Sequence, residues 1–180
     1  DEQWPYHVNF SNTDLLGNVT IPTGSPESIT LSHSASLDAS SSDYVLGTMN
    51  LLNNGDMGKI AKAFKLQPAE IAAGTLAAGK VTADGPTEGK VAIANTNPDG
   101  SISYAYSANG TGFWILADGT ADKWGESPVY FEYNSTGYSL AYGHKPGATV
   151  KDKSYTIRPT MVYMKDGKLY KAVIDLQMNF

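Results

Sequence analysis

The sequence predicts a mostly β protein, an antiparallel β-sandwich-like domain with one short helical insert at about residues 56–74. Composition is the first reason: 18 glycines and 11 tyrosines accompany a charged fraction of only 17%, which suits strands joined by tight turns. Alternation of apolar and polar side chains is the second reason, and closely spaced turn signals are the third. These signals lie at Asn97–Gly100, Ala117–Thr120, Asn134–Gly137 and Lys165–Lys168.

The last segment of the chain alternates most cleanly. One face of residues 170–180 carries the apolar side chains Tyr170, Ala172, Ile174, Leu176, Met178 and Phe180. A slip of one residue would expose this whole set, so we expect a firm register here. A closed barrel is the alternative architecture, because turns at this spacing suit a barrel as well as a sandwich.

The N-terminal half is less regular. Residues 4–10 alternate as a strand does, and short strand-like pieces follow at 18–21 and 28–31. Residues 34–43 are small and polar, which indicates a loop, and residues 44–52 are apolar enough for another strand.

One segment has helical spacing. Asp56 is expected to cap a helix over residues 57–65, which places Met57, Ile60, Ala61 and Phe64 on one stripe. Pro68 interrupts this helix, and residues 69–73 form a second short turn. Because the two pieces are too short for a helical domain, we expect them to cover the end or one face of a sheet.

Length and charge limit the class of protein. The 180 residues fit a single β-rich domain, to which residues 1–44 add strands and loops whose attachment the sequence does not define. The net charge is −5 and Arg158 is the single arginine, so we expect no nucleic-acid partner. No apolar run approaches the ~20 residues of a transmembrane segment. The absence of cysteine excludes disulfides but is compatible with export. Because the chain begins at Asp1 without methionine, we expect a processed piece that lacks its targeting segment.

Motifs for catalysis are weak. His7, His33 and His144 are far apart in the sequence, and no nucleophile elbow, phosphate loop or dinucleotide fingerprint occurs. We therefore expect no catalytic residue, no metal and no cofactor. Four acids beside the aromatic segment leave a weaker alternative, a glycoside hydrolase or a calcium loop, although turn formation and solubility also explain them. They are Asp118, Asp122, Glu126 and Glu132.

The aromatic residues favour binding instead. Residues 101–133 carry eight rings at strand spacing, so that one face fills a core and the other meets water or a partner. Flat rings stack on the C–H faces of sugars while polar groups bind the hydroxyl rim. The competing interpretation is that both faces are covered, one by a partner sheet and one by the helical insert. The candidate ligand-binding residues are Trp114, Trp124, Tyr130, Tyr138, Tyr142, Asp118 and Asp122.

Several short motifs in the second half of the chain are typical of a known family. They are Gly112–Trp114, Asp118–Gly119, Trp124–Gly125, Tyr130–Tyr133 and Tyr155–Ile157. On these motifs, the stretch from residue 45 to 180 resembles the domain of unknown function 4859, which is found in exported proteins of Bacteroides-type gut bacteria. The resemblance implies that residues 45–180 form the core of the domain. Residues 1–44 lie outside the resemblance, and the hairpin lacks the family's asparagine before Gly119.

The resemblance implies a setting rather than an activity. It implies an extracytoplasmic module, secreted or held at the cell surface as an outer-membrane lipoprotein, in organisms that forage on glycans. We therefore expect a non-catalytic carbohydrate-binding module whose partner is a polysaccharide or other glycan. The alternative is a cell-surface adhesion or structural module whose partner is a surface or host protein.

Overall fold

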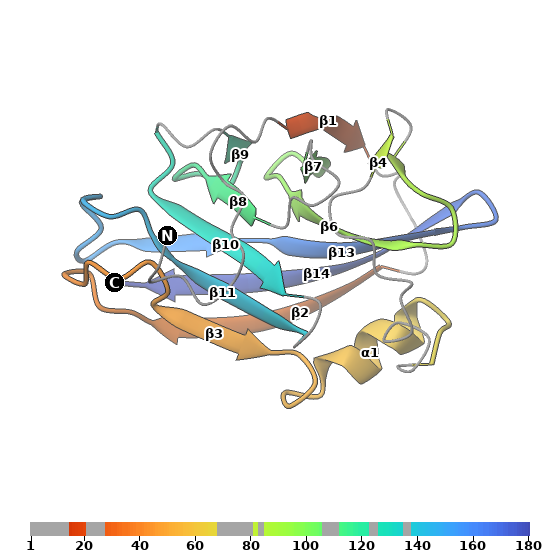
Figure 1. Cartoon of the computed structure of the whole chain (residues 1–180), viewed down its shortest axis with the longest axis horizontal. Coiled ribbons are helices and arrows are strands. Elements are labelled where there is room, and N and C mark those ends of the chain that lie inside the picture. The colour runs from red at the N-terminus through yellow and green to blue at the C-terminus, as the bar shows by residue number, and fades with distance from the viewer. Residues whose placement is uncertain are drawn as a thin grey trace.

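The structure, a computed structural model, confirms the mostly β, sandwich-like fold with one short helix (Figure 1). It describes residues 15–20, 28–67, 81–82, 85–105, 112–122, 126–134 and 138–180. The strands are β1 (Leu15–Thr20), β2 (Ser28–Ser36), β3 (Gly47–Asn50), β4 (Val81–Thr82), β5 (Gly85–Pro86), β6 (Val91–Thr96), β7 (Ser101–Ala105), β8 (Gly112–Ile115), β9 (Ala121–Asp122), β10 (Val129–Asn134), β11 (Ser139–His144), β12 (Ser154–Ile157), β13 (Pro159–Lys165) and β14 (Lys168–Asn179). The helix is α1 (Asp56–Ala63).

The larger sheet is built around β14. Its seven strands run in the order β1-β7-β6-β13-β14-β12, with β2 also paired to β14. β12 and β13 pair with successive parts of β14 without a change of register, from Ser154↔Asn179 to Lys165↔Lys168. β2 lies on the other side of β14 and runs parallel to it. The predicted alternation of β14 is confirmed, since the side chains at positions 170, 172, 174, 176 and 178 are all buried.

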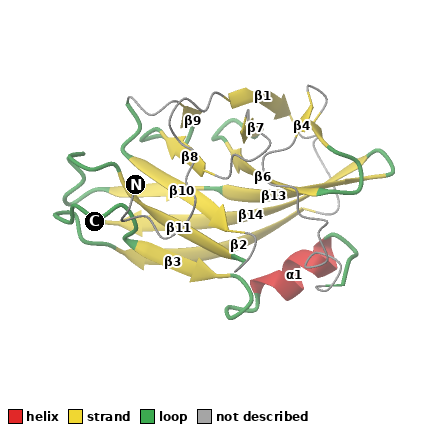
Figure 2. Cartoon of the chain, in the orientation of Figure 1, coloured by secondary structure: helices red, strands yellow, loops and turns green. Residues whose placement is uncertain are grey.

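The smaller sheet forms the second layer. Its order is β3-β11-β10-β8-β9, with antiparallel pairing throughout. Figure 2 shows β10, β11 and β3 in front of the strands of the larger sheet. Phe113 and Phe131 point into the core between the layers, where their rings stack at 4.9 Å. β4 and β5 form a separate pair.

The helix completes the layer that faces the larger sheet. Phe64, directly after α1, stacks on Tyr163 of β13 at 5.7 Å, so α1 covers part of the larger sheet as expected. The predicted cap is wrong. Gly55, with φ of 77°, precedes the helix, and Asp56 is its first residue. The Asp56 carboxylate instead contacts Nε2 of His33 on β2 at 2.6 Å, because the fold buries it against that strand.

The N-terminal half differs from expectation in the lengths of two strands. The strand predicted at 28–31 continues to Ser36, which removes the start of the predicted loop at 34–43. Parallel pairing with β14 as far as Asn179 keeps these small polar residues extended. The strand predicted at 44–52 is shorter and forms β3. The strand predicted at 4–10 and the helical turn predicted at 69–73 lie outside the described residues.

A buried amide joins the two sheets at one end. Asn97 follows β6 at the start of the predicted turn, and its side chain is 3% exposed. Its Oδ1 accepts bonds from Asn95 Nδ2 at 2.9 Å and from the backbone N–H of Ala121 in β9 at 3.0 Å. Its Nδ2 donates to Ser101 at 3.0 Å and Ser103 at 2.7 Å in β7. One side chain therefore ties the β6–β7 hairpin of the larger sheet to the β8–β9 hairpin of the smaller sheet.

Replacing this amide should weaken the whole sandwich. We expect Asn97→Ala to lower the free energy of unfolding by about 2–4 kcal/mol, because it leaves several buried donors and acceptors without partners. Urea denaturation followed by circular dichroism measures the loss. Asn53→Ala, at an exposed position in the turn before α1, is the matched control and should change stability by less than about 0.5 kcal/mol. Equal stability of Asn97→Ala and wild type would contradict this role.

Buried tyrosines predict alkaline unfolding. Burial raises the pKa values of Tyr104, Tyr130 and Tyr133 well above the ordinary value. Their stabilising contribution is fully present below the pKa of the unfolded chain, about 10, and is lost as the pH rises toward the folded pKa, because only the unfolded state then releases protons. Each tyrosine should lower the free energy of unfolding by about 1.4 kcal/mol per pH unit in that window.

Tyrosinate absorbance and far-ultraviolet circular dichroism should therefore change together in one cooperative step above about pH 10. Full tyrosine ionisation with unchanged circular dichroism would show that these three rings do not constrain the fold.

Candidate functional site

Register brings three of the candidate residues onto one line across the smaller sheet. Asp122 of β9 lies opposite Trp114 of β8, and Trp114 lies opposite Tyr130 of β10. Tyr130 in turn lies opposite Gly143 of β11. Residues in register share one face of a sheet, and this face points away from the core, since the neighbouring Phe113 and Phe131 point into it. We call Asp122, Trp114, Tyr130 and Gly143 the outer row.

The rings of the outer row are covered. Trp114 meets Tyr130 edge to face at 5.1 Å, and Tyr44 lies 6.4 Å from Tyr130. Tyr44 and Val45 pack on this small cluster. The expectation that Trp114 and Tyr130 are exposed is therefore wrong: their exposed fractions are 4% and 0%. The competing interpretation, in which both faces are covered, is closer to the structure, although residues 44–45 and not α1 provide the described contacts.

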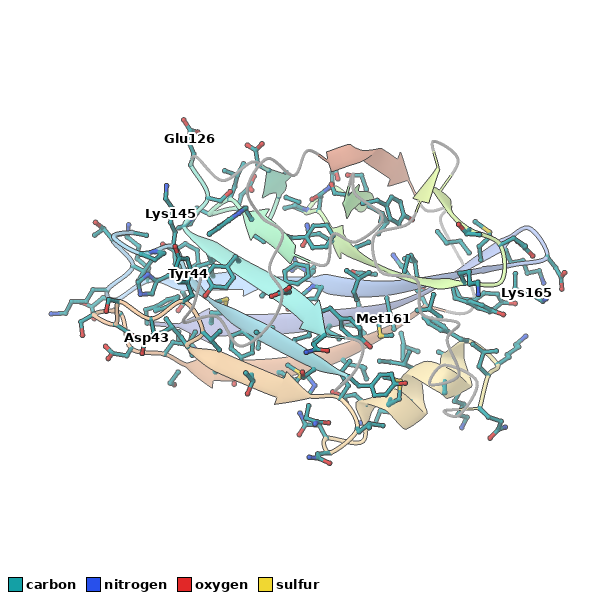
Figure 3. The ribbon with its side chains drawn as sticks, viewed as in Figure 1. Asp43, Tyr44, Glu126, Lys145, Met161 and Lys165 are labelled. Atoms are coloured by element: carbon teal, nitrogen blue, oxygen red, sulfur yellow. The ribbon has the colours of Figure 1, made fainter. Side chains whose placement is uncertain are left out.

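A missing side chain makes this cover possible. A Cβ added to Gly143 would lie 2.4 Å from the backbone oxygen of Tyr44 and 2.9 Å from the hydroxyl of Tyr130. Only glycine therefore lets residue 44 approach the sheet this closely. Figure 3 shows Tyr44 near Lys145 and on the same end of the molecule as Glu126.

The environment of the covered face shifts the pKa of Tyr130. Burial raises the pKa of Tyr130, and the neighbouring Tyr44 and Glu132 raise it further. Glu132 lies two residues along β10 on the same face and is itself 1% exposed. The phenol of Tyr130 consequently stays neutral, and the outer row offers a ring system rather than an anion at its centre.

The remaining aromatic candidates are not part of this row. Tyr142 points into the core and fills the space above Gly47, so the structure does not leave this candidate ring open to a ligand. Burial also raises the pKa of Tyr142. Tyr138 is half-buried and packs on the same core, with a left-handed backbone φ of 49°. Trp124 lies outside the described residues.

The acids are spread over different environments. Asp118 is exposed in the β8–β9 turn, where hydrogen bonds from the backbone and side chain of Thr120 lower the pKa of its carboxyl group. Asp122 and Glu126 are exposed, whereas Glu132 is buried. Within the described ranges, no group of three or more histidine or acidic side chains could hold a metal ion. No helix of the described chain is long and apolar enough to cross a membrane.

A cleft opens beside the outer row. It has a volume of about 380 Å³ and lies between residues 126–128 and 145–148. The β10–β11 ladder continues into its wall, since the backbone N–H of Lys145 donates to the carbonyl of Pro128 at 2.8 Å. The exposed Glu126 and the half-buried Lys145 give the cleft one acidic and one basic side chain.

Histidine 144 supports the cleft from the core side. Its ring is 2% exposed and meets Phe180 edge to face at 5.6 Å. Its Nδ1 lies 2.8 Å from the backbone oxygen of Lys145, and since a carbonyl can only accept, Nδ1 carries the proton. This bond holds the carbonyl of a cleft residue in place.

Sequence reasoning missed Tyr44, Lys145 and the supporting role of His144. Tyr44 was counted only as a strand residue, and no local pattern placed it over β10. Lys145 begins a Lys-Pro-Gly turn directly after a strand. This turn position is the only feature of the sequence that points to Lys145 as a surface residue near a site.

Adding a methyl group at Gly143 should displace the cover. We expect Gly143→Ala to push Tyr44 away from the sheet, lower the free energy of unfolding by about 1–3 kcal/mol and expose Trp114 to solvent. Fluorescence of Trp114, measured in a Trp4→Phe, Trp124→Phe background, should shift to the red and be quenched more strongly by acrylamide.

Gly58→Ala is the matched control. Gly58 is exposed in α1 with nothing within 4 Å of an added Cβ, so fluorescence should stay unchanged and stability should rise by up to about 1 kcal/mol. Unchanged Trp114 fluorescence in Gly143→Ala would mean that residue 44 does not cover the ring.

Comparison with known proteins identifies the family. The family model described as "Domain of unknown function (DUF4859)" matches residues 43–168, which cover β3 to the first residue of β14. The match includes the outer row and both walls of the cleft. No curated protein and no solved structure matches the chain. The chain therefore belongs to the DUF4859 family.

Proposed function

We propose that this domain is a non-catalytic carbohydrate-binding module and that the cleft between residues 126–128 and 145–148 receives the sugar. The observation that supports the proposal is a cleft of about 380 Å³ with Glu126 and Lys145 in its walls, which lies two residues along β10 and β11 from Tyr130 and Gly143 of the outer row. The cleft is shallow and largely open to solvent, so it would receive one face of a sugar ring rather than enclose it.

The chemistry of the walls suits a polyhydroxylated ligand. The Glu126 carboxylate accepts hydrogen bonds from hydroxyl groups, and the Lys145 ammonium group donates them. Pro128, Pro146 and Ala148 add apolar surface against which the C–H face of a sugar ring can pack. Polar groups at the rim with apolar surface between them are what a neutral sugar needs.

The aromatic residues have a changed role in this proposal. Trp114 and Tyr130 form a buried backing that fixes the strands behind the cleft, and they do not stack on the ligand. Trp124 lies outside the described residues, and it stays a candidate for ring stacking only because it is two residues from Glu126 in the sequence. Asp122 lies at the exposed edge of the row and adds a further acceptor.

Binding without hydrolysis is the form of the proposal that the cleft supports. Glycosidases generally use two carboxyl groups about 5 to 9.5 Å apart, one of them with a raised pKa. The described walls of the cleft contain one carboxylate, that of Glu126. The pKa of Asp118, an acid eight residues earlier in the sequence, is lowered rather than raised. We also propose that the module works outside the cytoplasm, secreted or at the cell surface, on the strength of the resemblance to domains of exported proteins.

A glycan array at concentrations up to about 1 mM, followed by calorimetry on the strongest hit, tests the proposal. We expect Glu126→Gln to weaken binding roughly ten-fold, because the hydrogen bond to a charged acceptor becomes a weaker bond to a neutral one. Trp124→Ala should weaken binding as well. Asp166→Asn, in the β13–β14 turn beside Lys165, is the control at the opposite end of the molecule and should bind like wild type (Figure 3).

Three results would overturn the proposal. Equal binding by wild type and Glu126→Gln would remove the cleft as the site. Silence across all glycans together with binding to a surface or host protein would favour the adhesion module instead. Release of reducing sugar that persists in wild type and disappears in Glu126→Gln would show a hydrolase.

A further inference from the structure

One edge of the larger sheet is open. β2 pairs with β14 along all nine of its residues, from Ser28↔Lys171 to Ser36↔Asn179. Within the described parts of the chain, no strand pairs with the other edge of β2, and no further backbone hydrogen bond involves residues 28–36. Figure 2 shows β2 as the outermost strand of the sheet on the side of α1.

Alternation decides which backbone groups face this open edge. The N–H of Leu37 donates to the carbonyl of Asn179 at 2.8 Å, so the odd-numbered residues of this segment direct their backbone groups toward β14. The even-numbered residues therefore direct their N–H and C=O groups outward. These residues also have exposed side chains, and they are Ser28, Thr30, Ser32, Ser34 and Ser36.

The open edge lacks the usual protection. Natural sheets block their edges with lysine, proline, bulges or very short strands. β2 contains no proline and no charged residue, and its register with β14 has no shift. The edge strands of the smaller sheet are much shorter, with four residues in β3 and two in β9. β2 is thus suited to pairing with another strand.

We propose that β2 pairs antiparallel with β2 of a second copy of this chain, about a two-fold axis beside Ser32. The segment Ser-Ile-Thr-Leu-Ser-His-Ser-Ala-Ser is nearly symmetric in chemical type around Ser32. In this register Ser28 lies opposite Ser36 of the second copy, and Thr30 lies opposite Ser34. Hydroxyl groups meet hydroxyl groups across the pair, which stabilises neighbouring strands.

The inner face of the pair is complementary in the same way. Ile29 lies opposite Ala35 of the second copy, and both are half-buried in the single chain. Leu31 lies opposite His33, whose Nε2 already contacts Asp56 within its own chain. No charged groups oppose each other along β2, despite the net charge of −5 on each copy. A symmetric interface requires one surface that matches itself, and an unrelated peptide would not need this symmetry.

Disulfide trapping tests both the dimer and its register. The chain has no cysteine, so a single introduced thiol reports on one position. Ser32→Cys places two thiols opposite each other with Cα atoms about 5.5 Å apart, which is within disulfide range. Ser28→Cys is the matched control, because its two copies lie roughly 27 Å apart. We expect rapid interchain crosslinking of Ser32→Cys and none of Ser28→Cys under mild oxidation.

Sedimentation equilibrium gives the second measurement. Ser32→Lys sets two ammonium groups against each other and should raise the dimer dissociation constant about tenfold or more, whereas Ser32→Thr should leave it nearly unchanged. Because the Ser32 side chain is exposed, thermal unfolding at matched protomer concentration checks that each variant folds. A chain that is monomeric up to about 1 mM, or crosslinking that is equal at positions 28 and 32, would overturn the proposal. A monomer whose β2 edge binds an extended foreign peptide would overturn the assignment of the second copy.

Discussion

The amide of Asn97 occupies the position where the two sheets must be joined without an apolar core. At this end the space between the β6–β7 and β8–β9 hairpins contains Asn95, Ser101 and Ser103, and the Asn97 side chain uses its oxygen and both of its hydrogens to bind across it. An amide can do this because it is both donor and acceptor, whereas a carboxylate or hydroxyl could satisfy only part of the set. The bond to the Ala121 N–H anchors β9, which pairs with β8, and β8 pairs with β10, so two ladders connect the amide to the outer row.

The outer row in turn explains why a sequence rich in aromatic residues leaves few rings in water. Gly143 removes one side chain from the row, and residue 44 lies in the space that this creates. The rings of Trp114 and Tyr130 become the base of a small second core, which makes them rigid and unavailable for stacking. Any ligand at this end therefore meets the polar walls of the cleft before it meets a described ring, and the proposed recognition shifts from ring stacking to hydrogen bonding by Glu126 and Lys145.

The sequence predicted what depends on short-range patterns. The alternation of β14, the Asn97–Gly100 turn and the Asp118–Gly119 turn follow from side-chain period and from the backbone freedom of glycine at φ of 89° and 99°. It did not predict what depends on contacts between distant segments. The burial of Trp114 requires Gly143 and Tyr44, and the continuation of β2 through Ser36 requires pairing with β14. The role of Asp56 was misjudged for the same reason, since His33 on a distant strand takes the carboxylate that was expected to cap the helix.

The lengths of the edge strands connect the fold to the proposed pairing of two copies. The smaller sheet ends in a two-residue strand on one side and a four-residue strand on the other, so little unpaired backbone is offered there. The larger sheet ends in β2, where nine residues in unbroken register present small hydroxyl side chains together with backbone groups that no strand of the described chain pairs. Exposed edges of this length are normally selected against, because they recruit other strands.

An uncharged edge on an acidic chain is therefore best explained by a partner that occupies it. The near-symmetry of β2 about Ser32 makes an identical strand the partner that fits with the fewest mismatches. Pairing there would leave the cleft free, because the lining residues 126–128 and 145–148 belong to segments adjoining β10 and β11 and not to β2.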